Sequence, residues 1–109
     1  MYNVVYTYYM EIFKDPIEFE WDKGNKDKNF KAHGVTNEEC EEIFFDPHKR
    51  IMNKIFHQGR EERYILIGAT KERRILFIAF TIRRKKIRVI SARGLSRKER
   101  KFYEESQNT

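Results

Sequence analysis

The chain is poor in the residues that build crosslinks and sharp turns. Its 109 residues include one cysteine, two prolines and five glycines. The single thiol, Cys40, cannot form a disulfide or a cysteine metal site within one chain, which fits a reducing cytoplasm. No apolar run reaches the length of a membrane-spanning helix, and residues 1–13 lack the basic leader and cleavage pattern of a signal peptide. We therefore expect a cytoplasmic protein that does not enter a membrane.

Charge, by contrast, is abundant and unevenly divided. The net charge is +6, yet residues 1–54 carry 8 basic and 11 acidic side chains, whereas residues 55–109 carry 15 and 6. Ten Lys or Arg residues fall between Arg83 and Lys101, with Glu99 as the only acid among them. Aromatic residues make up 15% of the chain, too many for a disordered tail. The pattern predicts one folded domain with a cationic surface, which would either bind a polyanion or simply be solvated.

The first half of the chain predicts a short strand followed by two helices. Residues 17–21 alternate between apolar and acidic side chains, as in a half-buried strand. Asp22 could cap a helix over residues 23–32. Thr36 and Glu39 have the spacing of a capping box and would start a second helix. Residues 1–16 are interpreted as an N-terminal extension, either a strand or an arm.

Cys40 belongs to an apolar stripe of this second predicted helix. Ile43 and Phe44 follow it at helical spacing. We interpret Cys40 as a core residue rather than a nucleophile, since free cysteine is often a small buried apolar group.

The second half predicts four strands and a final helix. Apolar runs over residues 49–56, 63–69, 75–82 and 87–92 are joined by short polar connections, which favours antiparallel pairing. Ser96 and Glu99 form a second capping box, which starts a helix to about residue 105; residues 106–109 should fray. The fold class is α+β, with two N-terminal helices, an antiparallel sheet of four to five strands and a C-terminal helix, the helices lying against one face of a curved sheet.

Several short motifs over residues 17–105 occur together in register. They are Phe19-Glu-Trp-Asp22, Asn29, His33-Gly-Val35, Phe45-Asp-Pro47, Glu61-Glu-Arg63, Ile67-Gly68, Thr81 with Arg83, Arg88-Val-Ile-Ser-Ala-Arg93, Glu99-Arg100 and Tyr103-Glu-Glu105. In these the chain resembles the BrnT toxins, the ribonuclease half of BrnT/BrnA toxin–antitoxin pairs, with a RelE-like fold. The resemblance implies a toxin domain over residues 17–105 and an endoribonuclease that halts translation. It also implies a BrnA-like antitoxin with a ribbon-helix-helix portion, and contact with operator DNA only through the complex.

RNA can be cut without a metal or other cofactor when its 2′-hydroxyl attacks the next phosphate. That reaction needs a base, cations that stabilise the transition state, and an acid. Histidine can serve as the base or the acid, and arginine can bind a phosphate through two parallel hydrogen bonds. We expect Arg63, Arg83 and Arg93 to form a phosphate clamp on one rim of the sheet. His33 is the leading base or acid, His57 the second, and Glu62 a further proton acceptor.

Seven further residues are candidates for RNA binding: Lys31, Thr81, Arg84, Arg88, Ser91, Arg97 and Tyr103. Thr81 and Ser91 could hold a phosphate oxygen, but we expect them simply to occupy strand positions. Tyr103 could stack on a base, but we expect it to pack the last helix on the sheet. Two positions where BrnT proteins usually carry lysine hold Asn25 and Ala32. Two alternatives therefore stay open, a nucleic-acid-binding module that does not cut and an inactive partner of a DNA-binding repressor.

Overall fold

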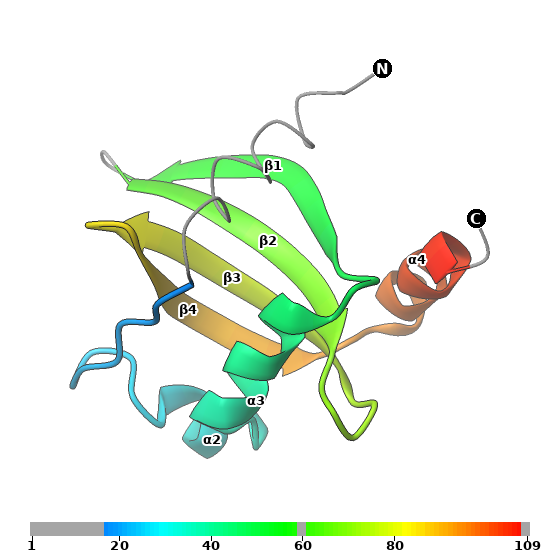
Figure 1. Ribbon diagram of the computed structural model, residues 1–109, viewed down its shortest axis with the longest axis horizontal. Helices are drawn as coiled ribbons and strands as arrows, with labels where there is room; N and C mark the ends of the chain where they lie inside the picture. The colour runs from blue at the N-terminus through cyan, green and yellow to red at the C-terminus, as the bar shows by residue number, and fades with distance from the viewer. Residues whose placement is uncertain (1–16, 59–60, 108–109) are drawn as a thin grey trace.

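Four antiparallel strands form the centre of the molecule. The computed structural model describes residues 17–58 and 61–107. The strands are β1 (Arg50–Gln58), β2 (Glu61–Ala69), β3 (Ile75–Arg83) and β4 (Lys86–Gly94), in the order β1-β2-β3-β4. Each strand pairs with its sequence neighbour, as short connections require. The predicted α+β class and four-stranded sheet are confirmed (Figure 1).

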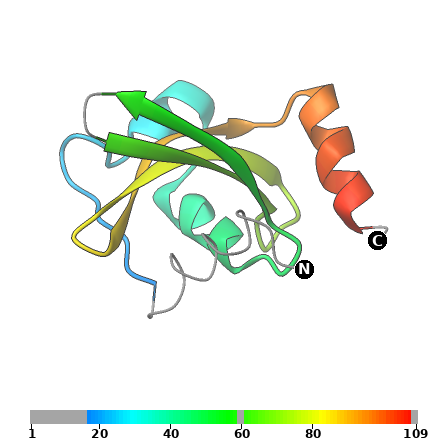
Figure 2. The same ribbon diagram turned by 90° about the horizontal axis from the view of Figure 1, so that it is seen from above.

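The helices occupy three different positions around this sheet. They are α2 (Lys28–His33), α3 (Asn37–Glu42, continued by the 3-10 turn Ile43–Phe45) and α4 (Arg97–Gln107). In Figures 1 and 2, α3 lies across one face, α2 runs beside β4, and α4 stands beyond the strand ends. The expectation that the helices lie against one face is therefore wrong for α4.

The core lies between α3 and the face of the sheet that it covers. Phe44 is 1% exposed and makes edge-to-face contacts with Phe19 and Phe80, with ring centroids 5.2 and 5.1 Å apart. Cys40 has no exposed surface, and burial raises the pKa of its thiol to about 12. A thiol with such a pKa stays protonated at neutral pH. The interpretation of Cys40 as a core residue is confirmed.

The segment before α2 differs from its prediction. Residues 17–21 form no full strand; Phe19 alone bridges to Ile87 in a parallel sense, although Ile17 and Trp21 also pack against the core. The helix predicted to begin at residue 23 begins at Lys28. The reason is local, because the Asp22 carboxylate accepts a bond from the Gly24 N–H instead of capping a helix.

Side-chain amides cover the outer edge of β4. Asn25 Nδ2 donates to the Val89 carbonyl at 3.2 Å, and Asn29 Oδ1 accepts from the Ala92 N–H at 2.9 Å. Both asparagines are at least 96% buried. They satisfy backbone groups that an open edge would leave exposed. Asn25 thus has a structural role that a lysine could not perform in the same way.

The turn between β3 and β4 has an unusual sequence for its geometry. Arg83 pairs with Lys86, which leaves Arg84 and Lys85 as a two-residue loop. Their φ angles are +50° and +67°. A hairpin loop with two such residues is a type I′ turn, which normally holds Asn-Gly because side chains with a bulky Cβ fit it poorly. Each non-glycine residue in this region costs about 1–2 kcal/mol.

Candidate functional site

Most of the predicted site residues on the strands fall at two opposite ends of the sheet. We call the end with the β3–β4 turn the hairpin rim and the end next to α4 the α4 rim. The hairpin rim holds Glu62, Arg63, Thr81, Arg83 and Arg84, and the α4 rim holds Arg93, Arg97 and Tyr103. His33 ends α2, which runs beside β4 (Figure 1). β3 and β4 run in opposite directions, so the end of one lies at the start of the other.

This register separates the three arginines of the expected clamp. Arg63 lies beside Thr81, whereas Arg93 pairs with Phe77, four residues further back along β3. At about 3.3 Å per residue, the two positions are ~13 Å apart along the strand direction alone. Arg83 lies still further from Arg93. The expectation that all three share one rim is wrong, although Arg63 and Arg83 do share one.

On the α4 rim, Arg93 is held by an acidic residue of α4. Its Nη1 and Nη2 donate to the two oxygens of Glu99 at 2.8 and 2.9 Å, and its guanidinium carbon lies 4.1 Å from the centre of the Phe77 ring. The bonds from Arg93 lower the pKa of Glu99 to about 2. Glu99 also completes the capping box with Ser96, as the sequence predicts. The planar fork of Arg93 thus faces a carboxylate, the group whose shape most resembles a phosphate edge.

The Arg93–Glu99 pair should make stability depend on pH. The Glu99 pKa is depressed on folding, so the pair contributes fully above the ordinary value of 4.5 and is lost as the pH falls towards 2. We expect Glu99→Gln, which keeps a capping side chain, to lower the free energy of unfolding by about 1 kcal/mol at pH 7. Denaturant unfolding from pH 7 to pH 2 should show this difference shrinking as the pH falls below 4.5. A difference that stays constant with pH would contradict the prediction.

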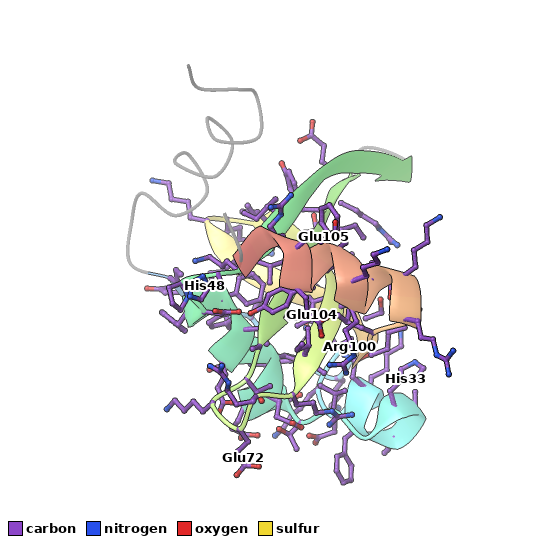
Figure 3. All side chains as sticks on the ribbon, turned by 90° about the vertical axis from the view of Figure 1, so that its right-hand side faces the viewer. His33, His48, Glu72, Arg100, Glu104 and Glu105 are labelled. Carbon is purple, nitrogen blue, oxygen red and sulfur yellow. The ribbon has the colours of Figure 1, made fainter. Side chains whose placement is uncertain are left out.

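His33 is the last residue of α2, and its side chain is exposed. Asn29, one helical turn earlier, is bonded to Ala92, the residue before Arg93. Arg74 fixes the end of α2, since its guanidinium donates to the Gly34 carbonyl at 2.9 Å. The same group pairs with Glu39 of the α3 cap at 3.3 Å. Figure 3 shows His33 and Arg100 on the same side of the view, away from His48 and Glu72.

Arg88 lies in a structural ion pair. Its guanidinium donates to both oxygens of Asp22, at 2.8 and 2.9 Å, and to Glu20 at 3.0 Å, and its side chain is only 12% exposed. The bonds from Arg88 hold the pKa of Asp22 below its usual range. This contact ties the segment before α2 to β4. The geometry offers no open face of Arg88 to an RNA phosphate.

Thr81 is likewise engaged inside the fold. It is 2% exposed, and its hydroxyl donates to the Glu62 carbonyl at 2.7 Å. The Glu62 carboxylate is exposed and accepts a bond from the Tyr64 hydroxyl at 3.0 Å. Thr81 therefore fills a strand position, the stronger of its two readings. Ser91, Lys31 and Arg97 are exposed, and the side chain of His57 lies outside the described residues.

Tyr103 packs α4 onto the rest of the fold. It is 3% exposed, and its hydroxyl donates to Asp46 Oδ2 at 2.5 Å. Asp46 also accepts from the Ala69 and His48 N–H groups, at 2.8 and 2.9 Å. Burial opposes ionisation of Asp46, but the bonds from Tyr103 and the two N–H groups lower its pKa overall. Burial, with Asp46 alongside, raises the pKa of Tyr103. This geometry matches the role that we expect for Tyr103 from the sequence, which is to pack the last helix.

A hollow of about 620 Å³ has none of the predicted site residues in its lining, although Asp46, the partner of Tyr103, belongs to its wall. Its walls come from α3, the 3-10 turn that follows and the β2–β3 loop. Three of the lining residues are acidic side chains of α3: Glu38, Glu41 and Glu42. That wall would repel a phosphate backbone. Among the described residues, no group of three or more His, Cys, Asp or Glu side chains could hold a metal ion.

The fold and these sites define a small α+β protein that carries its cations at both ends of an antiparallel sheet. Residues 21–99 match the family model of BrnT, described as a ribonuclease toxin of type II toxin–antitoxin systems. The match covers well over half of the chain, so the chain belongs to the BrnT family. A comparison with curated proteins gave no match. Membership confirms the resemblance seen in the sequence and implies a ribonuclease toxin with an antitoxin partner. No helix in the described part of the chain is long and apolar enough to span a membrane.

Sequence reasoning missed several residues that position the site. The sequence places Asp46 only in the Phe45-Asp-Pro47 motif, yet its carboxylate accepts a hydrogen bond from Tyr103 of α4. Arg74 received no role, although it holds the end of α2 beside His33. Arg74 contacts Glu39, which is 35 residues away in the sequence, and Asp46 contacts Tyr103, which is 57 residues away. The signal available in the sequence was the Phe45-Asp-Pro47 motif, in which a carboxylate precedes a proline near a buried face.

Proposed function

We propose that this protein is a metal-independent endoribonuclease toxin that cuts single-stranded RNA in the cytoplasm and thereby inhibits translation. The 2′-hydroxyl of the substrate attacks the adjacent phosphorus, which forms a 2′,3′-cyclic phosphate and releases the 5′-oxygen of the next nucleotide. A base takes the hydroxyl proton, and an acid protonates the leaving oxygen. The RNA supplies its own nucleophile, so the protein needs only proton transfer and charge stabilisation.

The observation that carries the proposal is that α2, which ends at the exposed His33, is bonded to β4, the strand that carries Arg93. Arg97 and Arg100 of α4 are exposed on the adjoining helix. In this scheme His33 moves the proton, and a substrate phosphate takes the place of the Glu99 carboxylate on the Arg93 fork. Arg63 and Arg83, on the hairpin rim, then bind other phosphates of the same RNA chain.

The antitoxin that we propose is BrnA-like, with a ribbon-helix-helix portion. Exposed cations on the α4 rim fit an acidic or amphipathic antitoxin segment, which would cover the groups that bind RNA. Contact with operator DNA would then come through the antitoxin in the complex.

A cleavage assay in the presence of a chelator tests the enzymatic proposal. We expect the purified toxin to cut single-stranded RNA with EDTA present and to leave 2′,3′-cyclic phosphate ends. Cleavage that stops with EDTA and returns with a divalent cation would overturn metal independence. The antitoxin complex, in which cutting should be suppressed, serves as the control.

One observation favours a second candidate, a module that binds nucleic acid without cutting it. Arg88 and Arg93 are both occupied by carboxylates, and Ala32 stands where the family usually has lysine. Salt-sensitive RNA binding without any cleavage in the same assay would support this candidate instead.

A further inference from the structure

The β3–β4 turn carries four consecutive cations. Arg83, Arg84, Lys85 and Lys86 are all exposed, and they occupy the tip of a two-residue hairpin (Figure 1). Within residues 17–58 and 61–107, no ion pair involves Arg84, Lys85 or Lys86. In this respect Arg84, Lys85 and Lys86 differ from Arg88 and Arg93, whose charges are neutralised by neighbouring carboxylates. We call these four residues the cationic tip.

The backbone of the cationic tip is in a conformation that its residues disfavour. Arg84 and Lys85 both have positive φ, where glycine or asparagine would be more stable. A tip that served only to reverse the chain would gain from Asn-Gly. The Arg-Lys pair instead holds two charges at the tip of the hairpin at the expense of stability. Strain of this kind is commonly found where a segment has a binding role.

The tip lies well away from the α4 rim. Arg83 is six residues along β3 from Phe77, the partner of Arg93, which amounts to ~20 Å of strand. One phosphate bound near Arg93 therefore could not touch the tip. A longer single strand that extends along the sheet could reach both places, because its backbone carries a charge at every nucleotide.

We propose that the cationic tip is a second, sequence-independent binding site for the phosphate backbone of RNA, separate from the place of cleavage. Arg84 and Lys85 contact phosphates of nucleotides remote from the scissile bond. Lys86 adds to the positive electrostatic potential that attracts the RNA backbone. The tip holds longer RNA and contributes nothing to the chemical step. The proposal rests on the proposed function only in taking RNA as the ligand.

The substitution Arg84→Asn/Lys85→Gly tests charge and strain together. It installs the preferred residues of a type I′ turn and removes two cations. We expect the melting temperature to rise by roughly 5 °C or more. We expect affinity for a long single-stranded RNA to fall roughly tenfold at 0.1 M salt, and the slope of log affinity against log salt to fall by about 1.4. The probe is a 2′-O-methyl RNA, which cannot be cut, so binding is measured whether or not the protein is a nuclease.

Three comparisons make the result decisive. Arg84→Gln/Lys85→Gln removes the charges but leaves the unfavourable backbone, and it should lose the same affinity without gaining stability. Lys28→Gln/Lys71→Gln removes two exposed cations elsewhere and should change RNA affinity less than twofold. Cleavage of a dinucleotide should be unaffected by the tip substitutions. Unchanged affinity for the long RNA in both tip variants would overturn the proposal, as would a loss of antitoxin binding with RNA binding intact. Absence of all cleavage by the unaltered protein would overturn the nuclease function while leaving the tip proposal standing.

Discussion

Replacing His33 with glutamine is expected to reduce RNA cleavage by about 10²–10⁴-fold while RNA binding changes little. Histidine is the side chain best suited to move protons at physiological pH, and His33 lies on the helix that is bonded to β4 beside Arg93. Glutamine keeps the size and polarity of the side chain but cannot move a proton. Single-turnover cleavage, with saturating protein over RNA, measures the chemical step directly.

A matched control exists in His48, which is also exposed but lies on a different part of the molecule (Figure 3). His48→Gln should retain cleavage within about twofold. If His33→Gln cuts at the normal rate, the proton transfer belongs to another residue and the proposed mechanism fails. Circular dichroism and RNA affinity should be unchanged in both variants, because His33 contributes only its backbone carbonyl to the bonds with Arg74.

The sequence predicted elements well wherever the signal was local. Thr36 with Glu39, and Ser96 with Glu99, start helices as their spacing requires, because a capping box is complete within four residues. The strands were found because each is a run of apolar residues with short polar connections. The start of α2 was missed because Gly24 and Asn25 bind Asp22 in a local turn, a contact that competes with the helix cap.

The site was harder to predict because it depends on register and on partners distant in sequence. The ends of β3 and β4 lie at opposite rims, so Arg83 and Arg93 had to be separated once antiparallel pairing was accepted. The occupation of Arg88 by Asp22 requires a contact across 66 residues, which no local pattern encodes. Sequence alone identified a cation-rich half of the protein but not which cations are already paired.

The Asp46–Tyr103 contact predicts the largest effect on stability. Asp46→Ala removes the acceptor for the Tyr103 hydroxyl and the Ala69 N–H, both within the fold. Each buried donor left without a partner costs about 1–3 kcal/mol, so we expect a loss of about 3–4 kcal/mol in the free energy of unfolding. That is a large fraction of the ~5–15 kcal/mol that stabilises a small domain. Urea denaturation followed by circular dichroism measures it, and Glu72→Ala, at an exposed loop position, is the neutral control.

A double-mutant cycle separates the α4 contact from the other bonds of Asp46. Tyr103→Phe removes only the hydroxyl and should cost about 1–2 kcal/mol, which keeps the protein folded even if Asp46→Ala does not. Because the two groups share one hydrogen bond, the double variant should lose less than the sum of the single losses. Simple additivity would mean that the two side chains do not interact. A coupled pair, by contrast, would make Asp46 one of the residues that hold α4, and with it Arg97 and Arg100, against the end of the sheet, alongside the Arg93–Glu99 pair.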